Sequence, residues 1–456
     1  MLSKLKIQKE NNKPSHFFKA SSWVLGGYFF SQIMRFSSNL ILTRILVPEM
    51  FGIMVIVNVI ITGIVMFSDI GIAQSIIQNP KGEQKSFLNT AWTIQVIRGF
   101  IIWSIICCLA AALFLFNVNN EVADTSVYSE PLLPWLLIVI GINSIISGFN
   151  STSIHQVNRN LNMGNWTLIT LFSQLIGILV MITLALLEKT IWALVLGTSV
   201  SSLILMILSH KMLPGIRNRF HLNKVAVYEI VRFGKWIFLS TAVGFIATQG
   251  DRIILGGLFT AEFLGIYGIA FMLSGLASQL VSTFSHKILF PKFSAVNRDT
   301  PNELKKILTK SRFWLNLLVF PTIGIAIALS MTLVGILYDE RYIDAGWILE
   351  ILFIRVAIGC ILIPSSICLM AIGMPKYTTI SAIINAVFVI VFLPLSFQYY
   401  DTYGVIISIG FSGLLSIPAL WYGLIRHKLF NFKNEVTAIL LLFIGYYVGT
   451  YINDFF

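Results

Sequence analysis

Charged residues are scarce in this sequence. Of its 456 residues, 11% are charged and 56% are hydrophobic, whereas an ordinary soluble domain is about 25% charged. So few charges cannot cover a surface that faces water. Apolar runs of roughly 20 residues or more, long enough for a helix to cross a ~30 Å hydrocarbon core, recur along the whole chain. The composition therefore excludes a soluble protein and predicts a membrane protein with many spans.

The alternation of apolar and polar residues that marks the strands of a membrane barrel is also missing. Lipid offers the backbone no hydrogen-bond partner, so only helices and closed barrels cross a membrane. The apolar runs are continuous here rather than alternating. We predict an all-α polytopic membrane protein.

Motifs for catalysis and for metal binding are absent as well. The four cysteines lie in apolar runs and form no CxxC pair, and none of the six histidines has the spacing of a metal site. The sequence contains no HExxH, GxSxG or GxxxxGKS/T stretch. We expect neither an enzyme nor a cofactor.

The positive charges are placed to set topology. The net charge is +12, but the bases lie in short loops between apolar runs, so we expect no nucleic-acid partner. The N-terminus lacks a short apolar core followed by a cleavage site, so residues 1–17 are predicted to form a basic cytoplasmic tail rather than a signal peptide.

Proline, glycine and charge clusters divide the chain into predicted spans. The thirteen spans lie near residues 18–47, 50–77, 87–116, 131–157, 161–187, 190–212, 229–258, 261–290, 309–337, 346–372, 375–400, 402–426 and 434–453. Lysine and arginine gather at the N-terminus and in alternate loops, while the intervening loop "NVNNEVADTSVYSEP" holds three acids and no base. By the positive-inside rule the N-terminus is cytoplasmic, and an odd number of spans places the C-terminus outside.

A hydrophilic break after the sixth span and an internal repeat divide the chain into two lobes. A shift of 213 residues places residues 41–56 over residues 254–269 with six identities, including Gly52 over Gly265. Six helices per lobe make the lobes parallel repeats around a central cavity, which is typical of transporters. The predicted parts are an N-lobe at 18–212, a linker at 213–228, a C-lobe at 229–426 and a C-terminal part at 427–456 with an accessory helix.

Charges inside spans are rare and mark a functional site or an ion pair. The candidates for substrate binding are Arg35, Arg98, Arg252, Arg355, Asp251 and Gln95. Gln95 precedes Arg98 by three residues and shares its helix face, and we expect Arg35 and Arg98 to face the lumen. Asp251 and Arg252 point about 100° apart on a helix, so each needs a partner elsewhere or a water-filled cavity. For these two residues, and for Arg355, a structural clamp and a substrate contact both stay open.

Uncharged polar residues give a second set of candidates. Asn143 and Asn150 lie on a polar face of the fourth span, and Gln174 lies on a similar face of the fifth. Such faces either bind sugar hydroxyls or form hydrogen bonds between helices.

Several motifs follow one another in a characteristic order. They are "LTRILVPEMFGIM", "FSDIGIAQSIIQ", "TAWTIQVIRG", "FGKWIFLSTAVGFIATQGDRIILGGLFTAEFLGIYGIA" and "ILFPKFSAVNRD". The chain, over roughly residues 15 to 430, resembles the polysaccharide-transporter branch of the multidrug/oligosaccharidyl-lipid/polysaccharide flippase superfamily, which includes the O-antigen flippases.

The resemblance implies two six-helix bundles in a V shape with a cationic central cavity. It implies alternating access that moves a lipid-linked oligosaccharide, on an undecaprenyl pyrophosphate carrier, across the bacterial inner membrane for lipopolysaccharide or exopolysaccharide synthesis. Implied partners are membrane lipids, a coupling proton or sodium ion, and other polysaccharide-assembly proteins. Arginines suit this substrate because a guanidinium group binds phosphate oxygens with two parallel hydrogen bonds.

Two other functions compete with this interpretation. A multidrug or cation exporter of the same superfamily would more naturally line its cavity with unpaired acids, whereas arginines outnumber acids in the spans here. A membrane polysaccharide polymerase or glycosyltransferase needs a large extramembrane loop, and no predicted loop exceeds about 20 residues.

Overall fold

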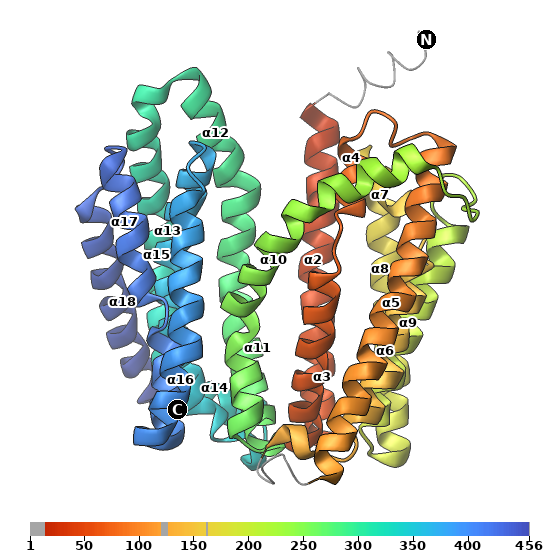
Figure 1. Cartoon of the computed structure of the whole chain (residues 1–456). Coiled ribbons are helices and arrows are strands. Elements are labelled where there is room, and N and C mark those ends of the chain that lie inside the picture. The colour runs from red at the N-terminus through yellow and green to blue at the C-terminus, as the bar shows by residue number, and fades with distance from the viewer. Residues whose placement is uncertain (1–13, 120–125, 161–162, 456) are drawn as a thin grey trace. The chain divides into compact units, whose positions relative to one another are not determined.

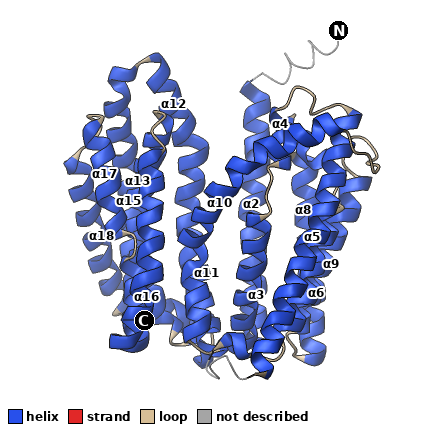
Figure 2. Cartoon of the chain, viewed as in Figure 1, coloured by secondary structure: helices blue, strands red, loops and turns tan. Residues whose placement is uncertain are grey.

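The computed structural model describes residues 14–119, 126–160 and 163–455. This part of the chain consists of helices and connecting loops, with no β-strand (Figure 2). The chain forms two compact units: unit 1 comprises Met1–Met50 and Val57–Ala242, and unit 2 comprises Phe51–Ile56 and Val243–Phe456. The division falls inside α10 (Lys224–Leu258), so one helix contributes to both units.

Unit 1 contains the first half of the helices (Figure 1). They are α2 (Pro14–Ile45), α3 (Pro48–Phe67, apart from residues 51–56), α4 (Ile72–Gln78), α5 (Lys85–Val118), η1 (Val127–Ser129), α6 (Leu133–Gly148), α7 (Ser153–Arg159), α8 (Gly164–Glu188), α9 (Trp192–Lys211) and the first part of α10.

Unit 2 contains the remaining helices. They are the second part of α10, α11 (Ala261–Phe284), η2 (Ser285–Leu289), α12 (Phe290–Asp299), η3 (Pro301–Glu303), α13 (Leu304–Ala328), α14 (Ser330–Leu337), η4 (Glu340–Tyr342), α15 (Ala345–Ala371), α16 (Lys376–Phe411), η5 (Leu414–Ser416), α17 (Ile417–Arg426) and α18 (Phe432–Asn453).

The helices have the lengths and compositions of membrane spans. Within the described residues, nine helical segments can cross a membrane, and the bent pair α6 and α7 would be a tenth. The segment Lys376–Arg426 has 51 residues, and at about 1.5 Å per residue it is long enough for two crossings. Its backbone breaks from helical geometry at Asp401 (φ 49°, ψ −142°). The prediction of an all-α polytopic membrane protein is confirmed.

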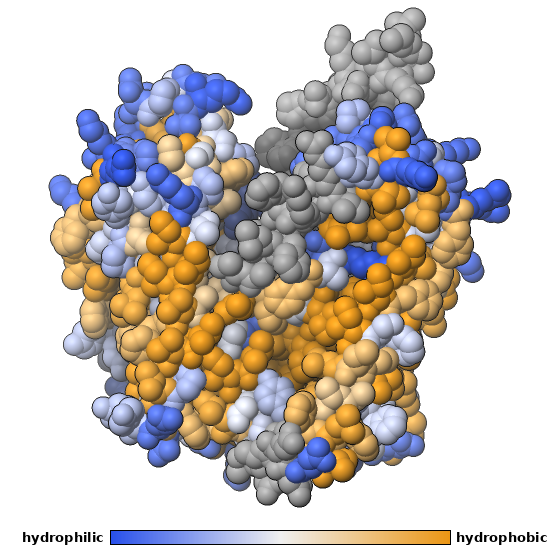
Figure 3. All heavy atoms as spheres, in the orientation of Figure 1, coloured by the Kyte–Doolittle hydropathy of each residue, from blue (hydrophilic) through white to orange (hydrophobic). Residues whose placement is uncertain are grey.

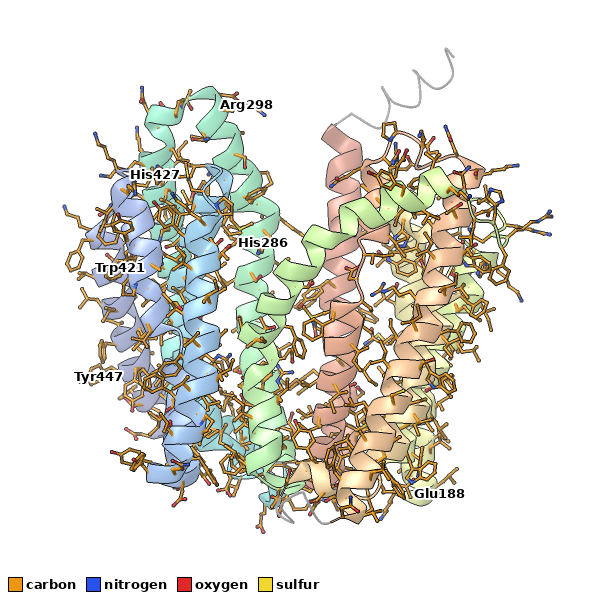
Figure 4. All side chains as sticks on the ribbon, in the orientation of Figure 1. Glu188, His286, Arg298, Trp421, His427 and Tyr447 are labelled. Atoms are coloured by element: carbon orange, nitrogen blue, oxygen red, sulfur yellow. The ribbon has the colours of Figure 1, made fainter. Side chains whose placement is uncertain are left out.

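Polar and apolar residues are distributed as a membrane requires. In Figure 3, hydrophobic residues cover the middle of the helices and hydrophilic residues gather at their ends. Arg298 and His427 lie at the same end of unit 2, and Tyr447 lies farther along α18 (Figure 4). Apolar side chains thus stay where lipid tails would contact them.

The helix boundaries fit the internal repeat. α2 ends at Ile45 and α3 begins at Pro48; α10 ends at Leu258 and α11 begins at Ala261. Both pairs of boundaries are 213 residues apart, the same offset that aligns the two sequences.

The C-terminal segment, expected as an accessory helix, is α18, which belongs to unit 2 and packs along α13. Glycine allows this close approach, because a Cβ atom on Gly445 would lie 2.2 Å from the carbonyl oxygen of Pro321. At one end of the contact, Nη1 and Nη2 of Arg312 donate to the Glu435 carboxylate at 2.6 and 2.9 Å, and both side chains are 3% exposed. The ion pair fixes the register of α18 on α13.

Two of the predicted spans in unit 1 are broken helices. The segment 50–77 is interrupted between α3 and α4 at Ser68–Gly71, where Gly71 has a left-handed φ of 67°. The segment 131–157 bends by 62° between α6 and α7. A break releases backbone carbonyls from the helical ladder, and inside a membrane these carbonyls need other donors.

Candidate functional site

Both breaks border a cavity of about 510 Å³ in unit 1. Its walls come from the end of α3, from α4, α5, α6 and α7, and from Trp166 of α8, Leu205 of α9 and Thr241 of α10. Among the predicted residues, Gln95, Arg98 and Asn150 line it. Transporters commonly place their binding sites at such discontinuous helices.

Arg98 of α5 holds the break between α3 and α4. Its Nη2 donates to the carbonyl oxygen of Val65 at 2.8 Å, and its Nε donates to the Ser68 hydroxyl at 3.2 Å. Its Nη1 lies 3.9 Å from the carboxylate of Asp69. The guanidinium therefore caps the end of α3 and has a counter-charge beside it.

Gln95, one turn earlier on the same face of α5, holds the other break. Its Nε2 donates to the carbonyl oxygens of Ser147, Gly148 and Asn150 at 3.0 to 3.2 Å. This contact depends on close packing of α5 against α6, because a Cβ atom on Gly99 would lie 2.6 Å from the Ser144 oxygen. The expected shared face of Gln95 and Arg98 is present, and it faces backbone carbonyls.

Unit 2 contains a second cavity, of about 650 Å³, between α10, α11, α15, α16 and the start of α17. Glycines leave room for it: a Cβ atom on Gly275 or Gly359 would meet no atom within 4 Å. Arg252 and Arg355 line this cavity, together with the polar residue Asn385.

Asp251 is the centre of a buried cluster in unit 2. Its side chain is 2% exposed and accepts hydrogen bonds from Arg355 Nη1 at 2.7 Å and from the Tyr267 hydroxyl at 3.1 Å. These contacts join α10, α11 and α15. Of the two roles left open for Asp251, the geometry favours the clamp.

Arg252 points elsewhere, as neighbouring residues on a helix must. Its guanidinium carbon lies 3.7 Å from the centre of the Phe271 ring, and its Nε is buried without an acceptor. Within the described chain, no side-chain hydrogen bond or ion pair of Arg252 is found. A cation–π contact orients the group and leaves its hydrogen-bond donors available to an anion in the cavity.

The other predicted residues are dispersed. The Ser31 hydroxyl of α2 donates to the Gln174 side-chain oxygen at 2.5 Å, and the Gln174 side-chain nitrogen donates to the Ser31 carbonyl oxygen at 3.1 Å. Gln174 thus forms hydrogen bonds between helices, one of the two roles expected for it. Asn143 does not line the unit 1 cavity, although its Oδ1 is buried without a donor. Arg35 is exposed on α2, and its guanidinium has no partner among the described residues.

Other polar residues of the cavities were not predicted. Gln74, His155 and Trp166 line the cavity of unit 1, and Gln249 and Asn385 line that of unit 2. The available signal was a single polar residue inside an apolar run, as for Gln74 in "GIAQSII". That pattern is too common in membrane helices to identify a cavity.

The sequence is similar to those of several proteins of polysaccharide synthesis. The chain is 22% identical to the lipopolysaccharide biosynthesis protein WzxC of Escherichia coli (strain K12) over 317 residues, which are 68% of this chain and 61% of WzxC. It is 21% identical to the succinoglycan biosynthesis transport protein ExoT of Rhizobium meliloti (strain 1021) over 285 residues, 61% of this chain and 54% of ExoT. The matches thus span about three fifths or less of these relatives.

The fold is shared with a solved flippase structure. Lipid II flippase MurJ in an inward closed conformation superposes with a TM-score of 0.72 at 17% sequence identity, over 94% of this chain and 92% of MurJ. The family model described as polysaccharide biosynthesis protein matches residues 41–346, about two thirds of the chain. The resemblance drawn from the sequence motifs is confirmed, and the chain belongs to the polysaccharide biosynthesis protein family.

Proposed function

We propose that the protein is a flippase that moves a lipid-linked oligosaccharide across the bacterial inner membrane by alternating access, for the synthesis of a surface polysaccharide. The observation that carries this proposal is Arg252, a cation inside a membrane helix that lines a cavity and has no side-chain acceptor among the described residues. A lone guanidinium is costly in such a place. A phosphate of the lipid carrier would offset that cost, because phosphate oxygens accept the donors of a guanidinium.

The family and the named relatives support the same class of function. WzxC and ExoT carry names from polysaccharide synthesis and transport. The fold shared with MurJ is that of a membrane transporter rather than an enzyme. For this chain, the substrate, the carrier and the direction of movement belong to the proposal.

The charge pattern favours a flippase over a cation exporter. A binding site for cations needs free acids, but within the described residues Asp69 is the one acid that lines either cavity, and it lies beside Arg98. Arg252 lines the unit 2 cavity, and its guanidinium donates no hydrogen bond to another residue in the described part of the chain.

The test is complementation of a strain that lacks the gene, with lipid-linked precursor measured on each face of the inner membrane. Arg252→Ala should reach wild-type levels in the membrane yet leave precursor on the cytoplasmic face, while Arg252→Lys should retain part of the export. The matched control is Arg298→Ala, which removes an exposed arginine that pairs with its neighbour Asp299.

Normal export by Arg252→Ala would remove Arg252 from the binding site. A wild-type protein that leaves the sidedness of the precursor unchanged would contradict the flippase function itself and favour an exporter.

A further inference from the structure

The cavity of unit 1 has its charges already balanced. The guanidinium of Arg98 donates to the Val65 carbonyl oxygen at 2.8 Å and to the Ser68 hydroxyl at 3.2 Å, and it lies 3.9 Å from the Asp69 carboxylate. The side chain of Asp69 is the counter-charge, and it lines the same cavity. A phosphate placed here would have to displace this carboxylate and uncap α3, so the cavity does not suit a strongly charged ligand.

Uncharged polar groups in this cavity remain available. Asn150 lines the cavity, and its buried Oδ1 has no donor among the described residues. Gln74 is exposed toward the cavity from α4, and Trp166 adds an indole ring with one N–H donor. No hydrogen bond of the Gln74 or Trp166 side chain is found within the described residues. Amide groups and an indole N–H are matched by ligand hydroxyl groups, which both donate and accept.

The two cavities therefore differ in chemistry. The unit 2 cavity holds Arg252 with its donors free, whereas Arg98 of the unit 1 cavity is committed to the protein. We propose that the unit 1 cavity is a carbohydrate subsite that takes an uncharged, hydroxyl-rich sugar residue of the glycan. Asn150, Gln74 and Trp166 contact the sugar, and Arg98 and Gln95 are positioning residues that hold the two helix breaks. This inference rests on the proposed function and assigns one part of its substrate to one site.

The positions of the contact residues explain why the breaks matter. Asn150 lies in the break between α6 and α7, and Gln74 lies on α4, directly after the other break. An unbroken helix would continue in its original direction and place these side chains elsewhere. Gln95 donates to the backbone of Asn150 itself, so the positioning hydrogen bond and the proposed sugar contact belong to one residue.

The binding experiment uses the full-length protein in lipid nanodiscs and two probes. The first probe is an oligosaccharide without phosphate, released by mild acid from the host's own lipid-linked precursor. The second probe is inorganic pyrophosphate. Isothermal titration calorimetry measures the binding of both probes. We expect Asn150→Ala to weaken glycan binding on the order of tenfold, as the loss of a hydrogen bond does, and Arg252→Ala to leave glycan binding unchanged. Asn158→Ala, an exposed asparagine on α7 outside the cavity, is the matched control.

The positioning role has its own readout. Arg98→Lys keeps a charged donor within reach of Val65 and should keep most of the glycan binding, while Arg98→Ala should lose it. Neither variant should change the binding of pyrophosphate. If Arg98 contacted phosphate directly, both variants would weaken it. Loss of pyrophosphate binding in Arg98→Ala would overturn the proposal, as would glycan binding that Asn150→Ala does not affect.

The outcome can be separated from that of the flippase function. A wild-type protein that moves precursor across the membrane but shows no Asn150-dependent glycan binding would refute the subsite alone. A protein that binds the released glycan and does not change precursor sidedness would refute the flippase.

Discussion

Adjacent charges in one membrane helix serve two purposes in this protein. Asp251 and Arg252 face different directions, because consecutive residues on a helix are about 100° apart. Asp251 is buried and bound by Arg355 and Tyr267, while Arg252 lies over Phe271 at the edge of a cavity. One charge is paired within the fold, and the other is the cation that we propose binds a phosphate of the substrate.

Removal of the buried acid should destabilise unit 2. In Asp251→Asn, the guanidinium of Arg355 loses its counter-charge, and breaking such a pair costs about 3–5 kcal/mol. The double variant Asp251→Asn with Arg355→Gln removes both charges and should recover much of that loss. Thermal unfolding of the purified protein measures both effects.

The neighbouring residue provides the control. Arg252→Gln removes no side-chain hydrogen bond found in the described chain, so its unfolding temperature should stay close to that of the wild type. A stable Asp251→Asn protein would show that the ion pair with Arg355 is not a clamp.

Whole elements depend on contacts between distant residues. α13 and α18 approach so closely that Gly324, Gly445 and Gly449 have no room for a side chain. Small residues allow such packing between membrane helices, and the Arg312–Glu435 pair then selects one register. The C-terminal helix is held along its length, from the ion pair to Gly449.

A bulky residue in this contact should separate the two helices. Gly445→Leu would place a Cβ atom 2.2 Å from the Pro321 oxygen and 2.7 Å from its Cα, and both of these are backbone atoms that cannot move aside easily. We expect a strong loss of folded protein, measured by fluorescence-detected size exclusion. Gly335→Leu adds the same side chain where no atom lies within 4 Å and should fold normally. Equal amounts of folded protein from both variants would mean that α18 does not need its contact with α13.

The elements were largely predictable from sequence, and their interruptions were not. Each predicted span falls on a helix or on a pair of helices, because hydropathy reports the transfer of side chains into lipid. The same measure ignores the backbone, so the runs 50–77 and 131–157 look continuous. The donors that make the breaks tolerable come from Gln95 and Arg98 of another helix.

The candidate site was predictable in its residue types and not in their partners. The spacing of Gln95 and Arg98 indicated a common face, and both side chains share one. Their acceptors are carbonyl oxygens of α3 and of the break after α6, which no pattern of side chains reveals. For Asp251, the sequence left two roles open, and the partner Arg355 lies 104 residues away.

At the scale of the whole molecule, the loop charges predict an orientation in the membrane. Lysine and arginine are retained in cytoplasmic loops by the positive-inside rule. The basic segment from α12 to the start of α13 is therefore proposed to be cytoplasmic. Thirteen spans would place the two chain ends on opposite sides, with the end of α18 outside.

Single cysteines test this orientation in intact cells. The four native cysteines are free of disulfides and are replaced by serine or alanine; Asp454→Cys and Lys306→Cys are then introduced separately, both at exposed positions. A membrane-impermeant maleimide should label position 454 in cells whose outer membrane alone is permeabilised, and should label position 306 only after the inner membrane is opened. Labelling of both positions only after that step would place the C-terminus inside and make the number of crossings even. One predicted span would then not cross, and the segment Lys376–Arg426, assigned two crossings because of its length and the turn at Asp401, would be the first to re-examine.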